Sequence, residues 1–252
     1  MLAQHFCQWR APCAPSNAVL CVGLELEDIT AWPDHCAPYA TPEEQQEAGR
    51  YAHAEDAARH LAGRALARRM LRAAYGQRIA AEFARTSYGK PFCPEISADF
   101  SISHSGRMVW VALCRCASVG IDVEKLRPLP DAAELTSQLH PHEREALLSL
   151  PRAELQTAFY RCWTRKEAVL KAVGMGLSMP LQSFSVYTGP QQNGWIASLA
   201  AVGPHDAAAT LDAIDQWTSS DIHATDGYQC SMAASAPHLE VVVRLADYPA
   251  QA

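Results

Sequence analysis

The 252-residue sequence has no long hydrophobic run: no apolar stretch approaches the roughly eighteen residues that a membrane-spanning helix requires. The N-terminus also has no apolar signal-peptide core, because His5, Gln8 and Arg10 interrupt it. Positive charge is in deficit, with 21 Lys and Arg against 27 Asp and Glu, so the formal net charge is −6. An acidic balance argues against a general nucleic-acid binder. These absences predict a cytoplasmic protein with no membrane and no nucleic acid among its partners.

Cysteine pairs of the C-x-x-C type are absent as well. The nine cysteines are an odd number, and we interpret them as reduced residues that mostly pack in the core. A zinc site is therefore not expected. The chain is long enough to bury a substantial core, in one large domain or in two small ones.

Three carboxylates carry the most information in the sequence. Residues 120–124 read GIDVE, and on a strand Asp122 and Glu124 point to the same face. Two like charges side by side are unfavourable unless they share a cation or a proton, and oxygen ligands suit Mg²⁺. Alone, the pair would be read more simply as a solvated strand edge. Glu167 and Lys171 are i,i+4 on a predicted helix, which is compatible with a surface ion pair or with parts of a site.

Hydrophobic periodicity and turn signals predict two successive groups of helices and strands. Residues 41–44, TPEE, form a capping box with proline at the first helical position, which predicts a helix or broken helix pair to about Tyr75. After the segment around Pro128, further helices are predicted at 131–139, 141–148 and 153–173. Strands are predicted at 18–24, 83–87, 100–103, 108–114, 119–123, 184–187, 195–198, 211–217, 228–233 and 239–245. The predicted fold class is therefore α+β.

Four short segments, in this order and at these separations, resemble the motifs of the Sfp-type 4′-phosphopantetheinyl transferases. They are GKP at 89–91, FSISHS at 100–105, GIDVE at 120–124 and WTRKEAVLK at 163–171. The segments RYAHAEDA at 50–57 and GMGLS at 174–178 reinforce the match. The resemblance extends from about residue 41 to about residue 187, and His60 departs from the threonine or alanine that is frequent in related sequences.

The resemblance implies a fold, an activity and a set of partners. The family is built as a pseudo-twofold duplication of two α+β halves with the active site between them, expected here at residues 1–127 and 128–252, with the catalytic helix at 153–173. The implied reaction transfers 4′-phosphopantetheine from coenzyme A to a serine of an acidic acyl or peptidyl carrier protein. It depends on Mg²⁺ and releases 3′,5′-ADP. The chain length suggests a monomer.

The resemblance also implies roles for individual residues. Mg²⁺ would be bound by Asp122, Glu124 and Glu167. The expected catalytic residues are Lys171, facing the diphosphate, and Glu167, which acts on the carrier serine directly or through a metal-bound water. The expected coenzyme ligands are Arg50, Arg59, Lys90, Ser103, His104, Lys166 and Lys171. Without the neighbouring motifs, His104 would be read as a core histidine bonded to a backbone carbonyl.

Two other functions remain open at this stage. A Mg²⁺-dependent diphosphate hydrolase would need the same three carboxylates, although the sequence has no glutamate-rich helix of the kind such hydrolases use. A non-catalytic carrier-binding module could retain the fold, although a degenerate copy would be expected to have lost a carboxylate or Lys171.

Two further patterns have simpler interpretations. Residues 140–143, HPHE, predict a helix start rather than a metal site, because proline is common at the first helical position. Arg64, Arg68 and Arg72 recur at i+4 and form a basic stripe, which is either a solvated helix face or a docking surface for an acidic carrier helix.

Overall fold

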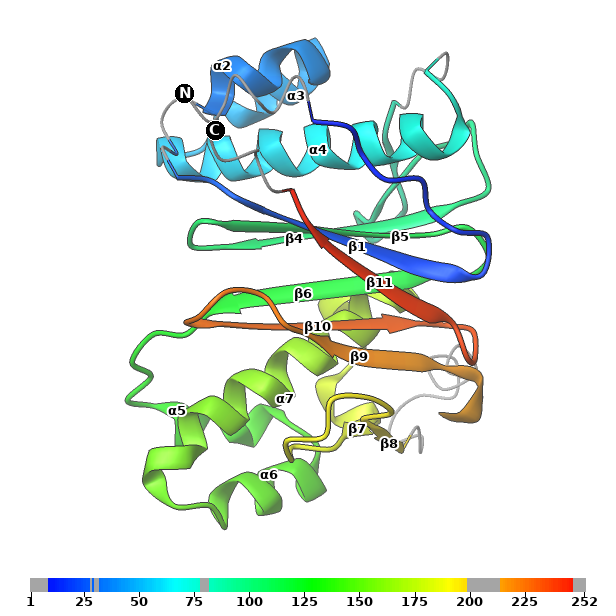
Figure 1. The fold of residues 1–252 in the computed structure, drawn as a ribbon. Helices are drawn as coiled ribbons and strands as arrows, with labels where there is room; N and C mark the ends of the chain where they lie inside the picture. Colours follow the sequence, from blue (N-terminus) through cyan, green and yellow to red (C-terminus); the bar gives the residue numbers. More distant parts are fainter. Residues whose placement is uncertain (1–8, 28, 30–31, 78–81, 199–213, 247–252) are drawn as a thin grey trace, which may run out of the picture.

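Four layers are stacked in the order helix, sheet, sheet, helix (Figure 1). Helix α4 (Ala54–Tyr75) covers the outer face of one sheet, and α7 (Arg152–Val173) covers the outer face of the other. Within the described part of the chain, no helix combines the length and the apolar character that crossing a membrane requires. The structure is a computed structural model that describes residues 9–27, 29, 32–77, 82–198 and 214–246.

The two middle layers are sheets that meet through their edge strands. The first sheet has, in order, β11 (Glu240–Leu245), β1 (Ala18–Glu25), β5 (Met108–Cys114) and β4 (Asp99–Ser105). The second has β6 (Val119–Lys125), β10 (Tyr228–Ala234) and β9 (Thr218–Ile222). Neighbouring strands are antiparallel except for the parallel pair β1 and β11. Strands β4 and β6 each end a strand order, and they lie next to each other.

The remaining elements are short and lie at the periphery (Figure 1). The helices among them are α2 (Trp32–Cys36), α3 (Pro42–Ala48), α5 (Ala132–Leu135) and α6 (Pro141–Leu148). The short strand pairs are β2 (Ala84–Arg85) with β3 (Pro91–Phe92), and β7 (Ser185–Val186) with β8 (Ile196–Ser198). Helices α2 and α3 lie beside α4, and α6 lies beside α7.

Apolar side chains fill all three spaces between the layers. Leu66 lies between α4 and the first sheet, Trp110 and Met232 lie between the two sheets, and Leu170 lies between α7 and the second sheet. Strand β1 reads as a continuous apolar run because both of its faces are buried. The three clusters fix the distances between the layers, and so position the edge where β4 and β6 meet.

Glycine permits the closest helix-to-strand contact. A Cβ atom placed on Gly120 of β6 would lie 1.9 Å from the carbonyl oxygen of Ala168 and 2.5 Å from the backbone nitrogen of Ala172, both on α7. On the other side of the sandwich, a Cβ atom on Gly63 of α4 would lie 2.6 Å from Cγ2 of Ile102 on β4. The two helices therefore approach their strands closely enough to bring their polar side chains to the β4–β6 edge.

Several of the sequence predictions are confirmed. The fold is α+β, and the broken helix pair is α3 followed by α4, with Thr41 and Glu44 forming the expected capping box. Residues 140–143 begin α6, where His140 and Glu143 cap the helix in the same reciprocal way. The eight cysteines in the described part of the chain are all free, and six of them are buried.

The predicted strand at residues 211–217 is wrong where the structure describes it. Residues 211–213 lie outside the described residues, Ile214–Gln216 form a 3₁₀ turn, and the strand β9 begins only at Thr218. The strand escaped prediction because two of its three buried residues, Ser219 and Ser220, are polar. Ser219, for example, accepts a hydrogen bond from the backbone nitrogen of Trp195, so burial of β9 does not require an apolar alternation.

Two strands pair with partners from the other part of the chain. Strand β6 precedes residue 127, yet it pairs with β10, and β11 near the C-terminus pairs with β1. The predicted boundary between residues 127 and 128 stays a prediction. The topology shows that a simple division of the sequence there would separate strands that are hydrogen-bonded to each other.

The close contact at Gly120 leads to the first testable prediction. Gly120→Ala should lower the free energy of unfolding by about 3 kcal/mol or more, because the added methyl group meets rigid helix backbone rather than a movable side chain. Gly49→Ala is the matched control: its Cβ would have ordinary contacts of 3.5 Å or more, so stability should change by less than about 0.5 kcal/mol. Urea unfolding measures both, and equal stabilities would contradict the proposed close packing.

Candidate functional site

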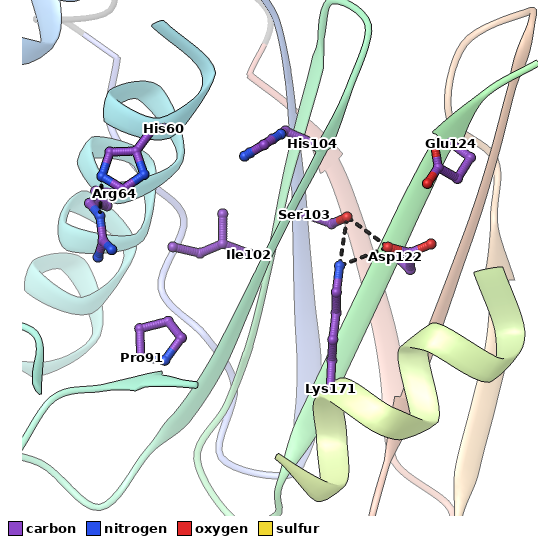
Figure 2. Close-up of a pocket in the computed structure, with 9 residues that line it drawn as sticks. All are labelled: His60, Arg64, Pro91, Ile102, Ser103, His104, Asp122, Glu124 and Lys171. Carbon is purple, nitrogen blue, oxygen red and sulfur yellow. Dashed lines mark hydrogen bonds and ion pairs between the residues drawn. The ribbon is translucent and has the colours of Figure 1, made fainter. Parts of the chain in front are cut away.

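A cavity of 310 Å³ opens where α4, β4, β6 and α7 converge (Figure 2). Its two sides differ in chemistry: imidazole and guanidinium groups from α4 face carboxylates from β6 and a lysine from α7. The lining residues are His60, Arg64, Pro91, Ile102, Ser103, His104, Asp122, Glu124 and Lys171. The predicted residues Ser103, His104, Asp122, Glu124 and Lys171 are thus brought together.

Asp122, Ser103 and Lys171 form a triangle of hydrogen bonds (Figure 2). The Lys171 ammonium donates to Oδ1 of Asp122 at 2.7 Å and to the Ser103 hydroxyl at 2.9 Å. Ser103 in turn donates to the same Oδ1 at 2.9 Å. Lys171 is therefore paired with Asp122, and no ion pair joins it to Glu167 within the described residues, which corrects the simple i,i+4 interpretation.

Asp122 is buried, with only 4% of its surface exposed, although the sequence allowed a solvated strand edge. Its second oxygen, Oδ2, is buried and has no hydrogen-bond partner among the described residues. A buried carboxylate oxygen without a donor is costly. The atom is therefore the clearest sign that this side of the cavity is built to face a cation.

The other two carboxylates lie close enough to Asp122 to feel its charge. Burial, together with the negative charge of Asp122, raises the pKa of Glu124. Burial and the charges of Asp122 and Glu124 also raise the pKa of Glu167, against the opposing effect of Lys171. The three carboxylates together carry more negative charge than the single ammonium group of Lys171 neutralises.

The three carboxylates are the type of ligand that Mg²⁺ prefers, but their side chains are not gathered around one point in this structure. In the described part of the chain, no group of three or more His, Cys, Asp or Glu side chains is gathered as a metal cluster. Glu167 lies outside the cavity lining, and Lys171 occupies one oxygen of Asp122. The donors are nonetheless carboxylate oxygens, which hard divalent ions prefer, and Oδ2 of Asp122 lacks a partner.

His104 lies on the cavity wall rather than in the core. It is exposed and lies on β4 beside Ser103, which contradicts the interpretation as a core histidine. Although His104 keeps contact with solvent, desolvation of its charged form by the surrounding cavity wall, followed by the positive charges of Lys171 and Arg59, lowers the pKa of His104 to about 4. The imidazole is therefore neutral at physiological pH in the absence of a bound anion.

His60 and Arg64 form the opposite wall and were not predicted as site residues. Arg64 donates to Nε2 of His60 at 2.9 Å, and Nδ1 of His60 lies 3.2 Å from the Tyr51 hydroxyl. Because Nε2 accepts, the neutral ring must carry its proton on Nδ1 and donate to Tyr51. The sequence marked His60 by its departure from the family pattern and Arg64 by its place in the basic stripe. No local pattern predicts that this wall faces β4, because that arrangement depends on contacts between distant residues.

Lys166 is wrong as a predicted coenzyme ligand. Its side chain is fully buried, and its ammonium donates to Oε1 of Glu143 at 2.8 Å and to the carbonyl oxygen of Phe184 at 2.7 Å. It therefore joins α7 to α6 and to the segment at Phe184. A residue adjacent to Glu167 lies about 100° away around the helix, so the two side chains cannot share one face.

Lys90 also lies outside the cavity lining. Its ammonium binds Oδ2 of Asp99 at 2.5 Å and the carbonyl oxygens of Val119 and Ala172 at 3.1 and 3.3 Å. These contacts join the β2–β3 segment to β4, β6 and α7. In this arrangement Lys90 holds elements together, and Pro91, the next residue, is the one that lines the cavity.

The arginines of the early helical region are placed less directly. Arg50 is exposed in the connection before α4. Arg59 donates to the carbonyl oxygen of Gly106 at 2.7 Å and pairs with Asp56, outside the cavity lining. Neither residue lines the cavity, so their assignment as coenzyme ligands stays a prediction.

The basic stripe is wrong as a docking surface for a carrier. Arg64 and Arg68 are buried, and Arg68 makes a bidentate ion pair with Glu44 at 2.7 and 2.8 Å. Its guanidinium also lies over the ring of Phe83, 4.4 Å from the centroid. Arg64 and Arg68 are therefore turned toward Glu44 of α3, and only Arg72, which is half-buried, keeps partial exposure among the three arginines of the stripe.

The environment of His104 generates a prediction about pH. By NMR titration, the His104 ring should remain neutral on acidification until about pH 4, rather than titrating near 6.5. Because its folded pKa is depressed, its contribution to stability is present above about pH 6.5 and is lost as the pH falls toward 4. His104→Gln should assign the resonance and flatten that decline. A midpoint near 6.5 in the free protein would contradict the described environment.

Comparisons with known proteins identify the family of the chain. Residues 118–233 match the family described as the 4′-phosphopantetheinyl transferase superfamily, and residues 34–116 match the 4′-phosphopantetheinyl transferase N-terminal family. The chain is 38% identical over 153 residues to the 4′-phosphopantetheinyl transferase Sfp of Bacillus subtilis. This aligned stretch covers 59% of the chain and 66% of that relative. The chain is 36% identical over 157 residues to the Bacillus subtilis transferase ffp, which covers 61% of the chain and 68% of that relative.

A more distant relative aligns over a longer stretch. The transferase HetI of a Nostoc species is 32% identical over 184 residues, which covers 71% of the chain and 72% of that relative. The chain thus spans about two thirds of the length of the curated relatives it matches. The chain belongs to the 4′-phosphopantetheinyl transferase superfamily.

Proposed function

We propose that this transferase moves 4′-phosphopantetheine from coenzyme A to a serine of an acyl or peptidyl carrier protein, with Mg²⁺, and releases 3′,5′-ADP. The observation that carries the proposal is the buried, partnerless Oδ2 of Asp122 beside Glu124 and Lys171 in the cavity. The similarity to proteins named 4′-phosphopantetheinyl transferases supports the substrate class.

The displacement takes place on a diphosphate, so the protein must chiefly position two reactants and neutralise charge. Asp122, Glu124 and Glu167 would hold Mg²⁺, which when bound supplies positive charge to the diphosphate oxygens. The raised pKa values of Glu124 and Glu167 support this role, because a cation relieves the repulsion that raises them.

Lys171 is proposed to face the leaving phosphate. Its ammonium has three donors, and two of them bind Asp122 and Ser103. The third is available to a phosphate oxygen in the cavity, since the side chain keeps 29% of its surface exposed. A fixed positive charge at that place stabilises the negative charge that develops on the 3′,5′-ADP oxygen.

Glu167 is proposed to accept the proton of the carrier serine. It lies one turn before Lys171 on α7, so one helix presents both groups to the same region. The Glu167 carboxylate would take the proton directly or through an intervening water. Glu167 then holds the proton that the serine loses as the new phosphate ester forms.

His104 and the α4 wall are proposed to bind the coenzyme's nucleotide end. Arg64 supplies one fixed positive charge and His104 an exposed imidazole on the side of the cavity away from the carboxylates, and His60 holds the Arg64 guanidinium in place. Anionic phosphate and the heterocycle of a nucleotide both suit such a wall. Arg50 and Arg59, near the same end of α4, are proposed as outer contacts of the 3′-phosphate.

We also propose that the fold is an internal duplication. Along the chain, the first unit runs β1, α4, β4, β5 and the second runs β6, α7, β9, β10, so each has one strand, a long helix and two further strands. Within its sheet, each unit has its last strand in the middle, in the orders β1-β5-β4 and β6-β10-β9. The two family matches meet between residues 116 and 118, immediately before β6. On this proposal the second unit begins at β6 rather than after residue 127.

Mass spectrometry of an apo carrier protein incubated with coenzyme A and Mg²⁺ tests the proposed function. One phosphopantetheine should be added to one serine, and the reaction should require both Mg²⁺ and the carrier. Coenzyme cleavage without a carrier would instead indicate a hydrolase, and binding without cleavage would indicate a non-catalytic module.

A monomer in solution and a cytoplasmic location are parts of the same proposal. Light scattering of the purified protein tests whether it is a monomer.

The proposed base gives a kinetic prediction. Glu167→Gln should lower transfer to a saturating carrier by roughly 10²-fold, the scale of one general-base contribution, without a large change in melting temperature. Glu154→Gln, an exposed acid at the start of the same helix, is the matched control and should retain the parent rate. If both variants are equally active, Glu167 is not the base.

The proposed contact of Lys171 with the leaving phosphate gives a second kinetic prediction. Lys171→Met keeps most of the side-chain volume but removes the charge, so transfer should fall about 10²-fold, corresponding to about 3 kcal/mol in the transition state. The loss should appear in kcat, because the charge develops only as the bond breaks. A change confined to KM for coenzyme A would show that Lys171 contributes to binding alone.

A further inference from the structure

Strands β4 and β6 belong to different sheets, and serine side chains join them where backbone pairing is absent. The serines alternate along β4 and therefore point to one side of the strand. Each hydroxyl oxygen accepts a backbone N–H of β6, at 3.2, 3.2 and 3.1 Å, with Ser101 bound to Ile121, Ser103 to Val123 and Ser105 to Lys125.

Among the described residues, two of the three hydroxyls also contact a carboxylate, and the third does not. Ser105 donates to Oε2 of Glu124 at 2.7 Å, and Ser103 donates to Oδ1 of Asp122 at 2.9 Å. A hydroxyl has one proton, so each of these donors is committed to a carboxylate. Ser101 has the same contact with β6 but stands opposite no acid.

We propose that Ser105, together with Ser103, is a positioning residue that sets the orientation of the β6 carboxylates for a divalent cation. This inference rests on the proposed function. A donor fixed to one oxygen of a carboxylate restricts its rotation and leaves the other oxygen turned away, which agrees with the partnerless Oδ2 of Asp122. Groups that orient metal ligands in this way change metal affinity without contacting the metal.

A purely structural role for the serines predicts a different pattern. If the serines served only to join the sheets, Ser101 would contribute most to the stability of the fold, because it binds the amide of the fully buried Ile121. The amide bound by Ser105 belongs to the exposed Lys125 and can turn to water instead. Ser101→Ala is therefore a strict control: it loses a β6 contact at least as important to the fold, but no contact with a carboxylate.

The test compares Ser105→Ala, Ser105→Thr and Ser101→Ala in the full chain. Mn²⁺ binding is measured by electron paramagnetic resonance with one equivalent of coenzyme A and no carrier, so that no turnover occurs. Ser105→Ala should bind Mn²⁺ about 10-fold more weakly than the parent, the lower end of the range for such outer contacts. Ser105→Thr keeps the hydroxyl on a strand-compatible side chain and should recover most of the affinity. Ser101→Ala should remain within about twofold of the parent, whatever its melting temperature.

The outcomes separate this inference from the proposed function. Equal Mn²⁺ affinity in Ser105→Ala and the parent, or equal losses in Ser105→Ala and Ser101→Ala, would overturn the positioning role while parent activity continued to support transfer. A parent that transfers no phosphopantetheine would overturn the proposed function itself. If Ser105→Ala binds weakly and Ser105→Thr does not recover, the hydroxyl is not the cause, and the inference is wrong.

Discussion

The backbone contact between Gly120 of β6 and helix α7 determines where the charged groups of the site can lie. No side chain separates the strand from the helix there, since any Cβ would lie 1.9 Å from the carbonyl oxygen of Ala168. Lys171 can consequently bind Asp122 directly, and Glu167 lies within the electrostatic range of both β6 acids. A bulkier residue at position 120 would displace the helix that carries both proposed catalytic groups.

The same closeness creates an electrostatic problem that the protein alone only partly solves. Three carboxylates face one ammonium group, and burial together with mutual repulsion raises the pKa values of Glu124 and Glu167. Hydrogen bonds from the β4 serines satisfy one oxygen of Glu124 and one of Asp122, but Oδ2 of Asp122 stays without a donor among the described residues. A divalent cation bound with an anionic substrate would satisfy both the charge and the open coordination position.

Local signals in the sequence predicted the elements and the acid pair well. The strand period placed Asp122 and Glu124 on one face, and the capping box at Thr41 located α3. Contacts between distant residues were beyond such signals. Lys166 and Glu143 form a buried ion pair although they are 23 positions apart in the sequence. Strand β9 has the polar sequence of an exposed strand, yet its buried serines are accommodated by hydrogen bonds such as that between Ser219 and Trp195.

The central claim is that Asp122, Glu124 and Glu167 together bind one divalent cation against the coenzyme's diphosphate. Crystals grown with coenzyme A and Mn²⁺ test it most directly, because anomalous diffraction locates the metal independently of any assumption about the ligands. The account predicts one anomalous peak within coordination distance of Oδ2 of Asp122 and of carboxylate oxygens of Glu124 and Glu167. A bound coenzyme with the peak elsewhere, or with any of the three carboxylates turned away from the metal, would contradict it.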